Sequence, residues 1–294
     1  MNFHKLIADI KIPQEDAAFL TELYDSVIGD EYFSDRLQKV KDASAALDAN
    51  TAVSLISEIA AHYGKTEYAI EALCLLLIGA DAKARYDALH IEQEIYTDCM
   101  ADIAPWMRMC KKETGEVGTL HNFDWLNQPM VPRIIKLGRL QFEMFVLKDH
   151  PQQGKRPDTL WAMPGNIPQG IPALNVHIPE GQPLSHEACL ASYARAKVFF
   201  AEKFNFVPQY FCCHSWLLAP ELKEILPQDS NILKFAADFD IICTDESSDA
   251  AWRIFGSKKP MPQDTALQRA AKAWFDAGNK IGAGQGIIKV KSEK

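Results

Sequence analysis

The sequence lacks an apolar run long enough to cross a bilayer, which takes about 18 residues or more. Its longest candidate covers residues 69–80 and is interrupted by Glu71, so we predict a buried helix there. The segment Met1–Lys5 also lacks the order of basic, apolar and small residues that marks a signal peptide. We therefore expect a cytoplasmic protein with no membrane partner.

Basic residues are too few to indicate a nucleic-acid partner. The formal net charge is −8, from 31 Lys and Arg against 39 Asp and Glu, and the sequence shows no stripe of basic residues. Nucleic-acid-binding domains carry such a basic patch. The composition therefore argues against binding to DNA or RNA.

Paired cysteine motifs are also absent. The chain holds seven cysteines, and none of them forms a Cys-x-x-Cys pair. An odd number without such spacing, in a chain expected to stay in the cytoplasm, predicts reduced and mostly buried thiols. We expect neither a disulfide framework nor a metal site.

Glycine and proline are scarce in the first 110 residues, which contain three and two of them, whereas 12 and 14 follow. The same part holds nine basic and 19 acidic side chains, against 22 and 20 in the remainder. Because glycine and proline weaken helix interiors, the first part is predicted to be nearly all helical. We divide the chain into a helical N-terminal domain, residues 1–117, and a second domain, residues 118–294.

The spacing of apolar residues supports this division. Helical spacing places Phe19, Leu20, Leu23 and Val27 on one face, whereas alternation after residue 117 predicts strands. The predicted strands cover residues 134–147, 174–178, 210–218, 240–244, 252–255 and 287–290, and the predicted helices cover residues 184–204, 220–226, 231–239 and 265–279. Strands that alternate with helices predict a mixed α/β sheet. The fold class is therefore α/β, in the α+β sense of a helical domain followed by a sheet domain.

Two motifs have both a functional and a structural interpretation. Residues 281–286 are glycine-rich, but they follow a predicted helix and leave too little chain for a βαβ unit. We predict a turn into the last strand there, not a nucleotide loop. The run from Cys212 to Ser215 contains capable nucleophiles, yet alternation on a strand puts neighbours on opposite faces. Buried structural thiols are favoured, and a hydrolase built on Cys213 or Ser215 is the most distant alternative.

His177 lies in a predicted strand, where it is either a structural histidine or a catalytic base. The turn at residues 179–185 leads from this strand into a predicted helix. A strand, a glycine turn and a helix N-terminus together present backbone N–H groups to an anion such as a pyrophosphate. An ordinary connecting loop is the equal alternative.

Blocks of sequence between residues 137 and 232 resemble those of a known family. They are Leu137–Glu143, Val176–Pro179 with Gly181–Leu184, Cys213–Leu218 and Ser230–Ile232. The resemblance is to a family of bacterial acyltransferase-like proteins, in which a helical N-acyltransferase N-terminal domain precedes a GNAT-like C-terminal domain. GNAT proteins are acyl-CoA-dependent N-acyltransferases.

The resemblance implies direct acyl transfer from a CoA thioester, the cosubstrate, to a small-molecule amine acceptor, without a metal. It implies His177 as the first candidate for the general base and Glu143 as the second, because an imidazole of pKa about 6.5 suits proton transfer at neutral pH. The residues assigned to acyl-CoA are Val176, Ile178, Glu180, Gly181, Gln182, Leu184 and Ser185. The tyrosine that usually acts as the general acid has no counterpart, since residues 218–239 contain no tyrosine.

One departure from the GNAT pattern keeps a second function open. GNAT proteins generally carry a Gln/Arg-x-x-Gly-x-Gly/Ala loop for the CoA pyrophosphate, and residues 180–185 lack it. Because a fold does not fix a function, the alternative is a non-catalytic ligand-binding or regulatory protein on a degenerate GNAT scaffold.

Overall fold

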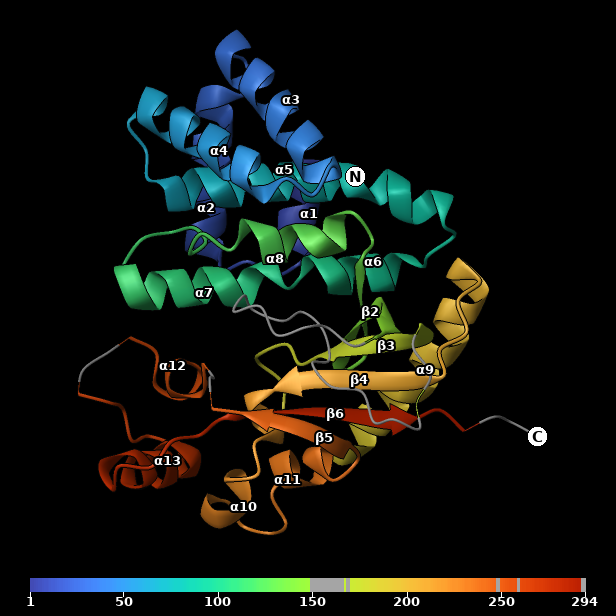
Figure 1. Cartoon of the computed structure of the whole chain (residues 1–294). Helices are drawn as coiled ribbons and strands as arrows, with labels where there is room; N and C mark the ends of the chain where they lie inside the picture. The colour runs from blue at the N-terminus through green and yellow to red at the C-terminus, as the bar shows by residue number, and fades with distance from the viewer. Residues whose placement is uncertain (149–166, 168–169, 247–248, 258–259, 292–294) are drawn as a thin grey trace. The chain divides into compact units, whose positions relative to one another are not determined.

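The computed structural model describes residues 1–148, 167, 170–246, 249–257 and 260–291. It divides into two compact units, Met1–Lys136 and Leu137–Lys294 (Figure 1). The first is helical and the second is built on a sheet, which confirms the predicted fold class. None of the helices in the described residues combines the length and the apolar character that a membrane span requires.

The first unit consists of helices joined by short loops. They are α1 (Phe3–Asp9), α2 (Gln14–Val27), α3 (Glu31–Ala45), α4 (Ala49–Tyr63), α5 (Glu67–Ala88), α6 (Gln93–Met100), α7 (Ile103–Thr114), α8 (Phe123–Asn127) and the 3-10 helix η1 (Gln128–Met130). Residues 69–80 of α5 are all buried, as predicted. Helix α5 packs against α1, α2, α3, α4 and α7, so it forms the core of this unit.

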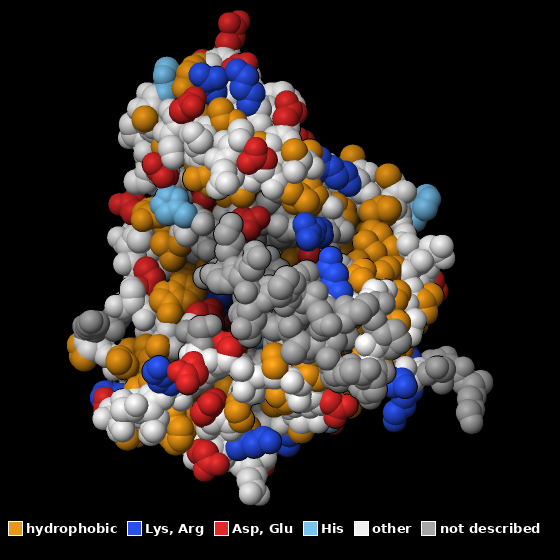
Figure 2. Space-filling view, viewed as in Figure 1, with side chains coloured by type: hydrophobic (Ala, Val, Ile, Leu, Met, Phe, Trp, Pro, Cys, Tyr) orange, Lys and Arg blue, Asp and Glu red, His pale blue; other side chains and the backbone are white. Residues whose placement is uncertain are grey.

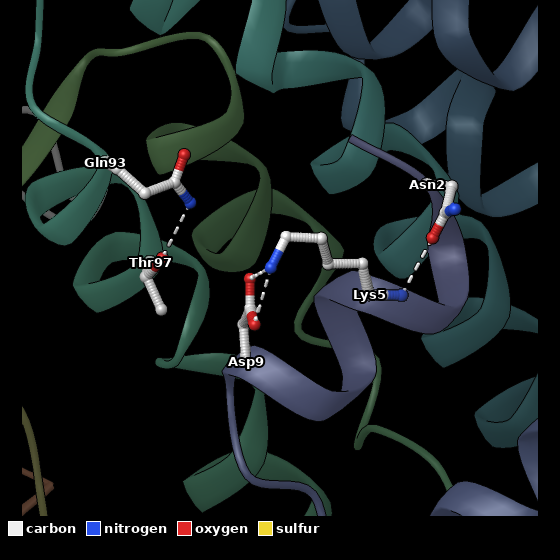
Figure 3. Close-up of polar contacts among 5 residues, drawn as sticks. All are labelled: Asn2, Lys5, Asp9, Gln93 and Thr97. Atoms are coloured by element: carbon white, nitrogen blue, oxygen red, sulfur yellow. Dashed lines mark hydrogen bonds and ion pairs between the residues drawn. The ribbon is translucent and has the colours of Figure 1, made fainter.

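Local side-chain contacts stabilise two short helices of this unit, α1 and α6 (Figure 3). The Asn2 side chain accepts a hydrogen bond of 2.8 Å from the backbone N–H of Lys5, which caps α1. Lys5 also pairs with Asp9 one turn later, at 3.0 Å. On α6, the Gln93 side chain donates to Thr97 at 3.1 Å. These i, i+4 contacts stabilise helices too short to be stable alone.

The first unit continues past residue 117, the predicted domain boundary, because a buried carboxylate holds the next segment. Glu71 on α5 accepts a hydrogen bond of 2.6 Å from the Thr119 hydroxyl and one of 3.0 Å from the backbone N–H of Asn122. Burial raises the pKa of Glu71. The change in composition near residue 117 therefore follows the end of α7, whereas the compact unit ends at Lys136.

The acidic side chains of the helical unit are dispersed on the face that Figure 2 shows. On the face shown in Figure 2, acidic side chains of this unit lie among basic, polar and apolar ones. Several acidic residues are paired with a basic one, including Asp81 with Lys41 at 2.7 Å and Glu58 with Arg36 at 3.3 Å. Such exposed ion pairs contribute little to stability, but each places a positive charge next to an acidic side chain.

The second unit is built on a six-stranded sheet of order β1-β2-β3-β4-β6-β5, whose first strand begins in the last residues of the first unit. The strands are β1 (Ile134–Leu137), β2 (Leu140–Leu147), β3 (Ile171–His177), β4 (Tyr210–Ser215), β5 (Asp240–Asp245) and β6 (Ala283–Lys289). Strands β3 and β4 are parallel, whereas β2 with β3, β4 with β6 and β5 with β6 are antiparallel. The helices are α9 (His186–Phe204), the 3-10 helix η2 (Trp216–Leu218), α10 (Leu222–Ile225), α11 (Asn231–Ala236), α12 (Ala250–Phe255) and α13 (Ala266–Asp276).

One predicted strand is wrong. Residues 252–255 belong to helix α12, which starts after Asp249. Ala250, Ile254 and Phe255 are buried at helical spacing, and Arg253 pairs with Asp249 one turn earlier at 2.6 Å. Four apolar residues are too few to distinguish a period of 2 from one of 3.6.

The glycine-rich segment also differs from the prediction, because Gly284 and Gly286 lie inside β6 and not in a turn before it. A Cβ atom on Gly284 would lie 2.4 Å from the carbonyl oxygen of Leu218, and one on Gly286 would lie 2.7 Å from Cβ of Phe239. The glycines therefore allow η2 and the start of β5 to pack directly on the backbone of β6.

All seven cysteines are free, and six of them are buried. We expect intact-mass analysis of the unfolded, unreduced chain after alkylation to show seven adducts, since no two thiols are joined. Fewer adducts would contradict this prediction, and a repeat after reduction would show whether a disulfide had blocked the missing sites.

Candidate functional site

A row of polar side chains crosses one face of the sheet. Glu143 on β2 is opposite Asn175 on β3, and Asn175 is opposite Cys212 on β4. Residues opposite each other share a face of the sheet, and so do residues two apart on a strand. His177 and His214 therefore lie on this face as well. The other face carries Phe142 and Phe211, which pack against Tyr193 of α9.

The structure brings the two predicted catalytic residues together. Nε2 of His177 lies 3.3 Å from Oε2 of Glu143 and 3.3 Å from Nδ2 of Asn175. The His177 and Glu143 side chains are 22% and 14% exposed, so both are partly accessible. A carboxylate next to an imidazole orients the ring and stabilises the imidazolium that forms when the ring accepts a proton.

Strands β3 and β4 stop pairing next to His177. Their register ends where Asn175 is opposite Cys212, whereas β3 continues to His177 and β4 to Ser215. Both ends remain in the sheet through their other neighbours, because His177 is opposite Gln141 of β2 and His214 is opposite Gln285 of β6. Among the described residues, the facing edges of these two ends are therefore not paired with each other.

The predicted CoA-binding turn connects the end of β3 to α9. Ser185 caps α9, and its hydroxyl accepts a hydrogen bond of 3.3 Å from the backbone N–H of Ala188. Glu180, Gly181 and Gln182 are exposed, and Gly181 has a φ of +112°, a conformation that favours glycine. Val176 and Leu184 are buried, and Ile178 and Ser185 are half-buried.

Arg139 holds this turn at both ends, a role that the sequence analysis missed. The side chain is only 8% exposed. Its Nη1 donates to the carbonyl oxygen of Pro179 at 2.9 Å, and its Nε donates to that of Pro183 at 3.1 Å. Burial lowers the pKa of the guanidinium, which nevertheless remains charged at neutral pH. Arg139 thus fixes residues 179–183 and carries a positive charge next to them.

The hydrolase alternative built on the cysteines and Ser215 gains no support. Cys213 is 1% exposed, and burial raises the pKa of its thiol to about 12. Burial also raises the pKa of Cys212 well above its ordinary value. The Ser215 hydroxyl accepts a hydrogen bond of 3.1 Å from the backbone N–H of Leu217, which caps η2. These groups are structural, since a reactive thiol needs a lowered pKa.

Two further imidazole–carboxylate pairs occur among the described residues of this unit. Nε2 of His186 lies 2.8 Å from Asp238, and Nε2 of His214 lies 2.9 Å from Asp245. The sequence analysis predicted neither of these pairs. Among the described residues, no group of three or more His, Cys, Asp and Glu side chains is arranged to hold a metal ion.

The fold and this site define a two-domain acyltransferase of the GNAT type. Residues 134–288 match the family described as the GNAT-like C-terminal domain, and residues 1–130 match the N-acyltransferase N-terminal domain. The chain belongs to the family that joins these two domains, which confirms the resemblance seen in the sequence. A comparison with curated protein sequences found no match.

Solved acyltransferase structures share the fold over nearly the whole chain. A complex with decanoyl-CoA is 20% identical with a TM-score of 0.73, and the match covers 98% of this chain and 87% of the other. A complex with decanoyl-CoA and teicoplanin gives the same identity and coverage with a TM-score of 0.72. A complex with CoA and 10C-teicoplanin is 19% identical, with the same coverage and a TM-score of 0.69. These likenesses establish a common fold.

Proposed function

We propose that the protein transfers an acyl group from acyl-CoA directly to the nitrogen of a small-molecule amine. The observation that carries this proposal is the contact between His177 and Glu143. This pair lies where β3 and β4 stop pairing, and a single turn connects the end of β3 to α9. Membership of the GNAT-like family and the acyl-CoA complexes of structurally similar acyltransferases support it.

In this proposal, the turn and the start of α9 bind the CoA pyrophosphate. The exposed turn residues and the first backbone N–H groups of α9 suit an anion, because the helix dipole is positive there. Arg139 keeps the turn in place and adds positive charge. The residues fit the group even without the usual glycine pattern, since backbone N–H groups provide the contacts in both cases.

The unpaired end of β3 then aligns the thioester. We assign this role to the backbone of Val176 and Ile178, whose N–H groups would polarise the carbonyl and stabilise the negative charge that develops on its oxygen. The amine nitrogen attacks the carbonyl carbon, and His177 accepts the proton that the nitrogen loses. Glu143 orients His177 and stabilises its charged form. Transfer needs no acyl-enzyme, because the neighbouring thiols are buried and protonated.

Binding of CoA tests the proposal before the acceptor is known. CoA or acetyl-CoA at about 100 times its dissociation constant is expected to stabilise the folded protein by about 2.7 kcal/mol and to raise the Tm accordingly. Gly181→Asp should abolish this shift, because a carboxylate at the turn would repel the phosphates. Gly115→Asp is the matched control, since Gly115 also has a positive φ and open space around it but lies in the helical unit.

The second candidate is the non-catalytic binding or regulatory protein, favoured by the missing glycine pattern at residues 180–185. The same experiment separates the two functions. If no CoA compound shifts the Tm of the well-folded protein, the acyltransferase proposal is wrong and the degenerate scaffold replaces it. We also propose a cytoplasmic location, which suits free cysteines and a CoA cosubstrate.

A further inference from the structure

The proposed reaction needs a second proton transfer, to the sulfur of the departing CoA. The tyrosine that usually donates this proton is missing from residues 218–239. Tyr193 does not replace it, because it is 7% exposed on the α9 side of the sheet and burial raises the pKa of its hydroxyl. The buried thiols of Cys212 and Cys213 lie next to the site but are equally out of reach.

His214 is placed on the opposite side of the unpaired region from His177. The last pair of β3 and β4 is Asn175 with Cys212, and each histidine lies two residues further along its own strand. Both therefore lie on the same face of the sheet as that last pair, and neighbouring parallel strands there are about 5 Å apart. A thioester held between the two strand ends has His177 on one side and His214 on the other.

The surroundings of His214 hold its imidazole in one orientation. Its Nε2 lies 2.9 Å from Oδ2 of Asp245, and the two side chains are 30% and 23% exposed. The two residues lie on strands at opposite sides of β6. On β6, Gln285 is opposite His214, and Ala283, two residues earlier, is opposite Asp245. The contact between His214 and Asp245 therefore crosses β6. Next to this pair on the same face are Cys212 and Gln285, and the Cys243 thiol donates to the Gln285 side-chain oxygen at 2.8 Å, whereas Glu143 lies on β2 at the other side of the row. Asp245 is a charged side chain in direct contact with this ring.

We propose that His214, held by Asp245, is the general acid that protonates the CoA sulfur as the carbon–sulfur bond breaks. This assignment rests on the proposed acyltransferase function. The amine nitrogen forms the new carbon–nitrogen bond and loses its proton to His177, and the electron pair of the carbon–sulfur bond stays with sulfur. The charged imidazole of His214, whose Nε2 is bonded to Asp245, gives the sulfur a proton from Nδ1. Exchange of protons with water then restores both histidines.

The protonation of bound CoA tests this assignment without an acceptor. If the charged imidazole contacts the sulfur, it stabilises the thiolate of bound CoA, so the acid dissociation constant of the bound thiol should exceed that of free CoA by about tenfold or more. The measurement is the ultraviolet absorbance of the thiolate as a function of pH. The complex with desulfo-CoA, which lacks the sulfur, provides the baseline for the protein's own tyrosines and cysteines.

Single substitutions of His214, Asp245 and His177 show which residue increases the acidity of the bound thiol. His214→Asn should return the acidity of the bound thiol to that of free CoA, and Asp245→Asn should reduce the enhancement. His177→Asn is the matched variant on the other strand and should retain it. Stabilisation of each variant by desulfo-CoA shows that it is folded and binds the nucleotide.

The outcomes distinguish this inference from the proposed function. CoA that binds with an ordinary thiol acidity, or an enhancement that His177→Asn removes and His214→Asn does not, overturns the assignment of His214 while the acyltransferase remains. Failure of wild-type protein to bind CoA and desulfo-CoA overturns both.

Discussion

Replacing His177 with alanine is expected to slow acyl transfer by about 100-fold to 10,000-fold, the usual contribution of a general base. The imidazole contacts Glu143 and Asn175 at the partly exposed end of β3, where it is placed to take a proton from an incoming amine. The measurement is the release of CoA from an acyl-CoA in the presence of the amine that supports the fastest wild-type rate. Stabilisation by CoA should remain, because the base is not part of the nucleotide turn.

Comparing variants of His177 and Glu143 shows which of the two residues is the general base. Glu143→Gln keeps a hydrogen-bonding group next to His177 but removes the charge, so it should lower kcat less than His177→Ala does. Unchanged turnover in His177→Ala would return His177 to a structural role. A larger loss in Glu143→Gln than in His177→Ala would make Glu143 the base.

Replacing Arg139 with methionine is expected to lower the free energy of unfolding by about 3–6 kcal/mol, because two hydrogen bonds from a charged group are lost and each contributes about 1.5–3 kcal/mol. The buried guanidinium bridges the carbonyl groups of Pro179 and Pro183. Stabilisation by CoA should fall with it, because the turn loses both its support and a positive charge. Urea unfolding with and without CoA measures the two effects.

Arg269→Met is the matched control. Its Nη1 also donates to two carbonyl groups, those of Gln263 and Asp264, at 2.9 and 3.0 Å, but these contacts are exposed. Water replaces exposed hydrogen bonds, so the loss should stay below about 1 kcal/mol and CoA binding should not change. Equal losses in the two variants would contradict the role assigned to Arg139.

The candidate site could be predicted from the sequence where it depends on local pattern. Alternation placed His177 in a strand, and the glycine turn before an amphipathic helix gave residues 179–185. The contact between His177 and Glu143 was not predicted, because it depends on the register of β2 with β3 across an intervening segment. Strand type and position follow from local sequence, whereas register follows from the packing of the whole sheet.

The contacts of Arg139 and Asp245 could not be predicted from sequence patterns. The partners of Arg139 are backbone carbonyl groups about 40 residues later in the chain. Every residue has a backbone carbonyl group, so the sequence does not indicate which of them accepts a hydrogen bond. Asp245 contacts His214 although their strands are not neighbours, because β6 lies between β4 and β5. The side chains that complete a site across such a sheet become apparent only once the order of the strands is known.

The position of β6 has a consequence for how the protein is made. Of all the strands described it comes last in the chain, yet it lies between β4 and β5 and is the strand that pairs with β5. During synthesis, the edges of β4 and β5 that pair with β6 therefore remain unpaired until residues 283–289 leave the ribosome. Unpaired strand edges can pair with other chains, so we expect the nascent protein to be prone to aggregation until β6 has been synthesised. The pairing of His214 with Asp245 is then among the last features of the sheet to form.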